Sequence, residues 1–140
     1  MPTSKPADKL TQLKRAARNL DDQHAQIASL ARQAEFLAGA GYAPALQSLL
    51  NELSERLQEH FEDEERLLQT LDFGALDAHK DSHLDLGKGL AGLLKAVSEE
   101  AAAATDVQQY ISGQLRAHFL AGDADVDLFI KGKLQEYAAA

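Results

Sequence analysis

The sequence predicts an all-α protein, an antiparallel up-down-up-down four-helix bundle with a short extra C-terminal helix. Two observations favour this fold class. The chain of 140 residues is rich in Ala, Leu, Glu and Gln, which are good helix formers. Apolar residues also recur at steps that alternate four and three, which is the spacing of a bundle-facing stripe. The breaks between the striped segments are short, so neighbouring helices are expected to be antiparallel.

We expect the first helix over residues 8–38 and the second over residues 43–71. Gly39 and Gly41 end the first helix, and Pro44 suits the first turn of the second. The first stripe is Leu13, Ala17, Leu20, His24, Ile27, Ala31, Ala34 and Ala38. The second stripe is Leu46, Leu50, Leu53, Leu57, His60, Glu64, Leu67 and Leu71.

We expect a third helix over residues 75–103, a fourth from Thr105 to Gly122, and a last helix over residues 125–137. The third stripe is His79, His83, Leu86, Leu90, Leu93 and Val97. The fourth stripe is Val107, Ile111, Leu115 and His118, and the last helix offers Leu128, Phe129 and Leu134 as a packing face. Gly87, Gly89 and Gly92 each cost a helix interior about 1 kcal/mol relative to Ala. They indicate either a close helix approach or, more boldly, a path for a gas.

Composition and charge exclude several classes of function. The length suits a single domain over residues 1–140, with residues 1–7 expected to be a flexible tail. A net charge of -8 disfavours nucleic acid and anionic membranes. The absence of Cys excludes disulfides and thiolate metal sites. The N-terminus lacks the apolar stretch of a secretory signal, and no segment resembles a membrane span, so we expect a soluble, cytoplasmic protein.

The second stripe contains two polar residues at positions that the rest of the helix gives to Leu. His60 and Glu64 are four residues apart, so both side chains lie on the inward face. Glu64 also belongs to an acidic run over residues 62–65, and such runs are usually solvated. Burying a carboxylate without a partner would cost several kcal/mol. An inward-pointing Glu64 therefore indicates a metal ion.

The other histidines lie on or beside the inward stripes of the other helices. His79 and His83 form a second pair four residues apart, which can chelate one metal ion or lie at a helix boundary without one. A single histidine such as His24 is more often an ordinary core residue. All five histidines of the chain nevertheless occupy such positions, which is improbable by chance and favours a shared site.

His118 and Asp123 are the last candidate ligands. Five residues along an ideal α-helix correspond to a rotation of about 140°, so Asp123 would leave the face of His118 if the α-helix continued. We expect Gly122 to break the helix and let Asp123 fold back toward the metal. An N-cap or solvated role for Asp123, Asp125 or Asp127 is the alternative.

A donor set of five imidazoles and two carboxylates indicates two metal ions. It exceeds the four ligands of a tetrahedral zinc site, and imidazole with carboxylate suits non-haem iron. If an oxo or hydroxo group bridges the ions, an ion with three histidines and both carboxylates is fully coordinated. Its neighbour with two histidines keeps one vacant position, which small-molecule binding or redox chemistry requires.

This set of motifs resembles the hemerythrin family. An early His followed by HxxxE, HxxxH and HxxxxD corresponds here to His24, to His60 and Glu64, to His79 and His83, and to His118 and Asp123. The resemblance covers residues 21–123. Further similarity lies in Asp21, three residues before the first of these histidines, and in the run from His60 to Glu65.

The resemblance implies two Fe ions (Fe2+/Fe3+) with a bridging oxo or hydroxo group, and dioxygen as the ligand of one iron. It assigns His79, His83 and His118 to the saturated iron, His24 and His60 to the iron with the vacancy, and Glu64 and Asp123 to the bridges. It also implies an apolar dioxygen pocket of Ile27, Phe61, Leu115 and Phe119, which would exclude water and protons. Family members often carry Trp where this chain has Gln114, whose amide either faces the pocket or faces solvent.

The leading hypothesis is a protein that binds dioxygen reversibly for storage, carriage, delivery or sensing, rather than an enzyme. Its partner would be dioxygen or another small diatomic or peroxide ligand, and not a nucleic acid or a membrane. One alternative is a di-iron enzyme acting on peroxide, nitric oxide or ferrous iron. Another is a metal-free helical interaction module.

Overall fold

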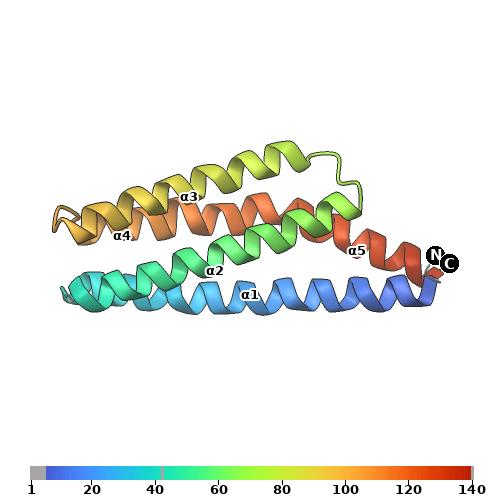
Figure 1. Ribbon diagram of the computed structural model, residues 1–140, viewed down its shortest axis with the longest axis horizontal. Helices are drawn as coiled ribbons and strands as arrows, with labels where there is room; N and C mark the ends of the chain where they lie inside the picture. Colours follow the sequence, from blue (N-terminus) through green and yellow to red (C-terminus); the bar gives the residue numbers. More distant parts are fainter. Residues whose placement is uncertain (1–5, 42, 140) are drawn as a thin grey trace.

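The first three helices are long rods. The computed structural model describes residues 6–41 and 43–139. The first three rods are α1 (Pro6–Ala40), α2 (Ala43–Thr70) and α3 (Leu76–Ser98), and a fourth rod follows them (Figure 1). α1 is followed by Gly41, whose φ of 78° lies in the left-handed region that glycine adopts without a Cβ clash. Within the described residues, no helix combines the length and the apolar character needed to cross a membrane.

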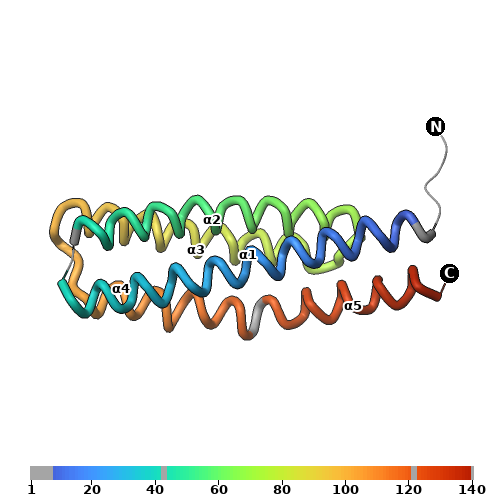
Figure 2. Tube along the Cα trace, turned by 90° about the horizontal axis from the view of Figure 1, so that it is seen from below, coloured from blue at the N-terminus to red at the C-terminus, as the bar shows by residue number. Residues whose placement is uncertain are grey.

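The fourth rod alternates between two kinds of helix. It consists of α4 (Ala104–Gln109), the π-helical segments η1 (Tyr110–Leu115) and η2 (His118–Gly122), and α5 (Asp123–Ala139). α5 follows η2 directly, so the expected extra C-terminal helix continues the fourth rod without a break (Figure 2). The turns of π-helix widen the rod locally, which matters for the candidate site.

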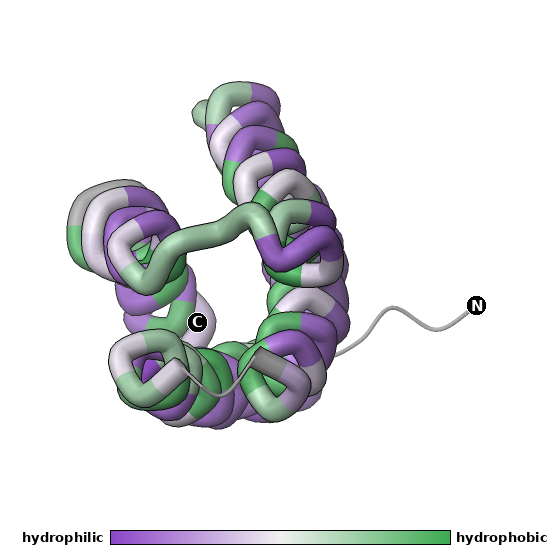
Figure 3. Tube along the Cα trace, turned by 90° about the vertical axis from the view of Figure 1, so that its left-hand side faces the viewer, coloured by the Kyte–Doolittle hydropathy of each residue, from purple (hydrophilic) through white to green (hydrophobic). Residues whose placement is uncertain are grey.

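The four rods enclose a common axis (Figure 3). α1 packs against α2, α4 and α5, α2 packs against α3, and α3 packs against η1. The start of α1 and the end of α5 lie at the same end of the bundle (Figure 1). The expected fold class, an all-α four-helix bundle, is confirmed.

The helix ends differ from the expected ones for local reasons. α1 begins at Pro6, so residues 6 and 7 are helical rather than tail, and residues 1–5 lie outside the described part of the chain. α3 ends five residues before the expected position 103. Glu100 adopts a positive φ of 55°, and the N–H groups of Glu100 and Ala101 bond to the carbonyls of Val97 and Ala96. This Schellman pattern closes the helix.

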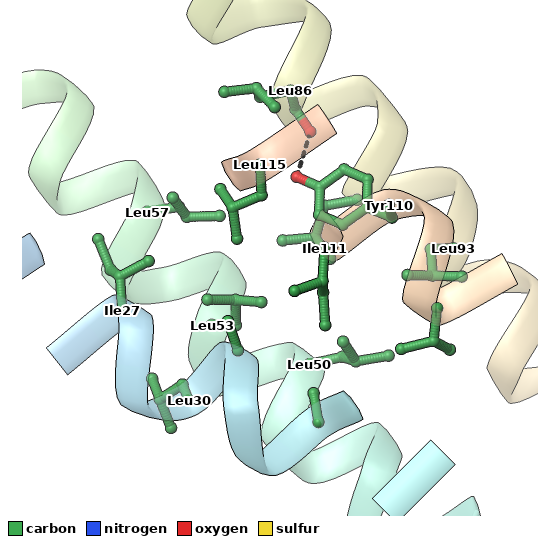
Figure 4. Packing of buried hydrophobic residues seen from close by; sticks show 14 of the residues in the cluster. Ile27, Leu30, Leu50, Leu53, Leu57, Leu86, Leu93, Tyr110, Ile111 and Leu115 are labelled. Carbon is green, nitrogen blue, oxygen red and sulfur yellow. Dashed lines mark hydrogen bonds between the residues drawn. The ribbon is translucent and has the colours of Figure 1, made fainter. Parts of the chain in front are cut away.

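The core consists of two apolar clusters that lie at different levels of the bundle. The larger cluster is built from residues of all four rods, including Ile27, Leu50, Leu53, Leu57, Leu86, Leu90, Ile111 and Leu115 (Figure 4). The smaller cluster contains Leu13, Leu20, Leu68, Leu71, Val126 and Ile130. On α1 and the fourth rod, the predicted polar ligands fall between residues of the two clusters, and on α2 Glu64 lies between Phe61 and Leu68. The bundle therefore has a polar layer between two apolar ones.

The expected packing face of the last helix was partly wrong. Leu128 is 69% exposed, whereas Val126 and Ile130 are buried and Phe129 and Leu134 are partly buried. The expectation assumed a new helix after a break at Gly122. Because the rod is continuous, its phase is set by the buried Asp123, and positions three and seven residues later face the core.

Only one of the three glycines of α3 lies at a close helix approach. A Cβ on Gly89 would lie 2.8 Å from Gln114 Oε1 and 3.1 Å from Tyr110 Cε2, whereas a Cβ on Gly87 or Gly92 would meet nothing within 4 Å.

We therefore expect Gly92→Ala to raise the free energy of unfolding by about 0.5–1 kcal/mol. Gly89→Ala should gain less or destabilise, and urea denaturation of both variants checks this. Equal gains would contradict the close approach at Gly89.

Candidate metal centre

The polar layer brings together all seven candidate ligands from the four rods. α1 supplies His24, α2 supplies His60 and Glu64, α3 supplies His79 and His83, and the fourth rod supplies His118 and Asp123. His60, Glu64 and Asp123 are at most 1% exposed, and His24 is the most exposed member, with 26% of its side chain accessible. Such burial of charged and polar groups is unusual unless they are paired.

Asp123 reaches the site by a route that the sequence analysis did not foresee. The chain does not break at Gly122, because η2 continues into α5. Instead, the N–H of Asp123 bonds to the carbonyl of His118, five residues earlier. This wider π turn returns Asp123 to the face of His118, so that His118 Nε2 lies 3.1 Å from Asp123 Oδ1. The expected break was wrong, but the expected proximity of the two side chains is present.

The two oxygens of Glu64 face different histidines. Oε2 lies 3.3 Å from His60 Nε2. Oε1 lies 3.2 Å from His83 Nε2 and is also in contact with His79 Nε2. The carboxylate therefore spans the space between the histidine of α2 and the two histidines of α3.

Asp123 spans the same space from the opposite side. Its Oδ2 lies 3.1 Å from His24 Nε2, and its Oδ1 lies 3.1 Å from His118 Nε2 and 3.6 Å from His79 Nε2. The donor atoms form two groups, each with all its atoms within 4.8 Å of one another. One group is His79, His83, His118 and Asp123, and the other is His24, His60, Glu64 and Asp123.

The donor atoms lack the partners that a metal-free core would need. Among the described residues, the Nε2 atoms of His24, His60, His83 and His118 and both oxygens of Asp123 are buried without a hydrogen bond. Unpartnered buried polar atoms are rare and costly. These atoms converge on two small spaces, and imidazole nitrogen and carboxylate oxygen are ligands of transition metals. The residues therefore fit a pair of cations.

Proton affinities within the layer reflect the same convergence. Burial alone would raise the pKa of Glu64, but the adjacent imidazoles of His60, His79 and His83 lower it far below its usual range. Burial opposes the charged form of His24 and His79, yet contacts with Asp123 and Glu64 respectively raise both pKa values. Without a metal, these contacts thus favour the protonated form of both imidazoles. A metal ion competes with protons for these nitrogens, so its affinity should fall as the pH falls.

Comparison with known proteins agrees with this geometry. A family model described as Hemerythrin HHE cation binding domain matches residues 15–126. This chain belongs to the hemerythrin family. It is also similar to a curated protein named Myohemerythrin from Theromyzon tessulatum, with 36% identity over 58 residues, which are 41% of this chain and 48% of that protein. The chain thus matches about half the length of this relative. No solved structure gives a significant match.

Membership of the hemerythrin family, together with the two donor groups, identifies a metal-binding protein. Three side chains that support these donors were not singled out from the sequence. Gln23, Glu65 and Ser82 contact the Nδ1 atoms of His60, His83 and His118 at 2.9, 2.7 and 3.2 Å. Such partners orient the imidazoles of a metal site. Gln23 could have been found, because it lies three residues after Leu20 and four before Ile27, which is core spacing for a polar residue.

The residues expected to form the apolar pocket of a hemerythrin lie beside the donors, with one exception. Ile27, Phe61 and Leu115 are buried, and the ring of Phe119 lies 4.8 Å from that of His24. Phe61 stacks on His83, with ring centroids 3.9 Å apart. Gln114, by contrast, is exposed and lies against Gly89 of α3. The expectation that Gln114 lines the pocket is thus corrected in favour of the solvent-facing alternative, because Leu115 occupies the inward position of this turn.

Proposed function

We propose that this chain holds two iron ions, joined by an oxo or hydroxo bridge, and binds dioxygen reversibly at one of them. His79, His83 and His118 would hold one ion, His24 and His60 would hold the other, and Glu64 and Asp123 would bridge them. One observation carries this proposal: each carboxylate directs one oxygen to the two-histidine group and the other to the three-histidine group. A single ion would not require that arrangement twice.

The unequal histidine count supports a role in binding a small ligand. With the oxo or hydroxo bridge and one oxygen from each carboxylate, two histidines would leave an octahedral ion one ligand short, whereas three histidines would complete the other ion. When bound, the iron pair supplies reversible electron transfer to dioxygen. The group with two histidines includes His24, the most accessible of the histidines. A small molecule would therefore reach this ion more easily than the buried one.

Apolar side chains of the fourth rod would protect that position from water. Leu115 and Phe119 line a groove of about 230 Å³ between α1 and the fourth rod. The ring of Phe119 lies between this groove and the histidines, at 4.8 Å from the ring of His24 and 6.2 Å from that of His60. Dioxygen, which is small and apolar, suits such a wall better than a charged substrate does.

Metal analysis combined with optical spectroscopy tests the proposal. Protein loaded with ferrous iron without air should contain about two irons per chain, stay nearly colourless, and gain charge-transfer absorption when dioxygen is admitted. Removing dioxygen should reverse the change. Absence of bound iron would favour the metal-free interaction module. Rapid turnover of peroxide or nitric oxide, well above that of free iron, would favour a di-iron enzyme.

A further inference from the structure

A chain of hydrogen bonds connects the centre to a carboxylate that is not a candidate ligand. His60 Nδ1 lies 2.9 Å from Gln23 Oε1. Gln23 Nε2 donates to Asp63 Oδ2 at 2.7 Å. The path crosses from α2 to α1 and back, and Gln23 is only 9% exposed at the crossing. The three residues therefore act as one unit.

The carboxylate of Asp63 decides which group donates and which accepts in each hydrogen bond of this path. An ionised carboxylate only accepts hydrogen bonds, so Asp63 must face the NH2 group of Gln23. The amide oxygen of Gln23 then faces His60, and an oxygen can only accept. The proton of a neutral His60 is therefore held on Nδ1. Its Nε2 keeps a free lone pair, directed toward the layer where Glu64 Oε2 lies 3.3 Å away.

Asp63 is itself held in position. Asn19 Nδ2 donates to the same Oδ2 at 3.2 Å, and Arg66 lies 3.5 Å from Oδ1. Both neighbours direct N–H groups at Asp63, which favours its ionised carboxylate, a group that only accepts hydrogen bonds. The other supported imidazoles differ: His83 contacts the carboxylate of Glu65 directly, and His118 contacts the hydroxyl of Ser82, which can donate or accept. Of these three described contacts, only that of His60 runs through an amide, whose two ends can exchange places.

We infer that Asp63 is a positioning residue that, acting through Gln23, selects the His60 tautomer whose Nε2 is free to bind a cation. Without Asp63, the amide of Gln23 can turn over and donate to Nδ1. His60 would then carry its proton on Nε2 and direct a donor at the metal position. The inference rests on the proposed metal site for its purpose, but the tautomer itself is a property of the metal-free chain.

Two measurements on Asp63→Ala test this. Long-range proton–nitrogen NMR correlations of the metal-free chain, at about pH 9 where an ordinary imidazole is neutral, report which nitrogen of His60 is protonated. We expect a protonated Nδ1 in the unsubstituted chain and a substantial unprotonated fraction in Asp63→Ala. In iron-loaded protein, transfer of iron to a chelator should be about tenfold faster for this variant.

A second substitution separates tautomer selection from a merely structural role. Gln23→Glu combined with Asp63→Ala restores the total charge and places an acceptor-only carboxylate against Nδ1. We expect this double variant to recover both the protonated Nδ1 and the slow iron transfer. Glu62→Ala is the matched control, because Glu62 is the exposed neighbour of Asp63 and accepts its hydrogen bond from Gln58. It should behave like the unsubstituted chain.

Several results would overturn the inference. These are an unprotonated Nδ1 in the unsubstituted chain, an unchanged His60 in Asp63→Ala, the same losses in Glu62→Ala, or no recovery in the double variant. If the chain binds no iron, the proposed function fails. The NMR measurement on the metal-free chain still decides whether Asp63 selects the tautomer.

Discussion

Glu64→Gln is expected to abolish binding of the metal pair, the largest effect of any single substitution in this chain. The amide has nearly the volume of the carboxylate, so the packing of this 1% exposed side chain is preserved. It carries no charge and offers one oxygen in place of two. Because Glu64 faces His60 with one oxygen and His83 with the other, the single amide oxygen cannot serve both sides, and the link between the two donor groups is lost.

The loss should be visible as stoichiometry and as colour. Affinity for the pair should fall by at least about 100-fold, beyond the upper range for removal of an outer-sphere partner. Elemental analysis should find at most one residual ion, and the charge-transfer absorption should be absent. Glu59→Gln, an exposed change five residues earlier on α2, is the matched control and should bind iron normally. Full binding by Glu64→Gln would exclude Glu64 as a bridge.

Removing the metal is expected to destabilise the whole bundle. A metal that binds only the folded chain stabilises it by mass action, by about 4 kcal/mol when the free metal exceeds its dissociation constant 1,000-fold. For a domain of this size, that corresponds to a decrease in melting temperature of about 12 °C on chelation. Calorimetry with and without chelator measures the difference. Equal melting temperatures would mean that the folded chain holds no metal.

The two apolar clusters should respond differently to that removal. The smaller cluster joins the ends of α1, α2 and α5, and the polar layer separates it from the larger cluster. Without cations, the polar layer contains buried polar atoms that make no hydrogen bond, such as His118 Nε2 and Asp123 Oδ1. Amide hydrogen exchange should therefore accelerate most around Leu68 and Val126 and least around Leu50 and Leu90. Uniform acceleration would show that the layer does not divide the bundle.

Helix periodicity is enough to predict the bundle and most of the polar layer from the amino-acid sequence. An α-helix repeats its faces every three or four residues, so a periodic pattern places His60 and Glu64 on the same face as Leu53 and Leu57 without any knowledge of the other helices. The same reasoning placed His79, His83 and His118 on inward faces, where they are buried. Local periodicity is sufficient here because it depends only on the geometry of one regular helix.

Periodicity could not predict the features in which helices depart from ideal geometry or depend on one another. The π turn that returns Asp123 to the face of His118 costs regular hydrogen bonding, and the contacts it allows lie on other rods. The continuous fourth rod in turn set the phase that exposed Leu128. The link from His60 through Gln23 to Asp63 joins α2 to α1. A single-helix pattern contains no information about such pairings, because they are fixed by how the rods pack.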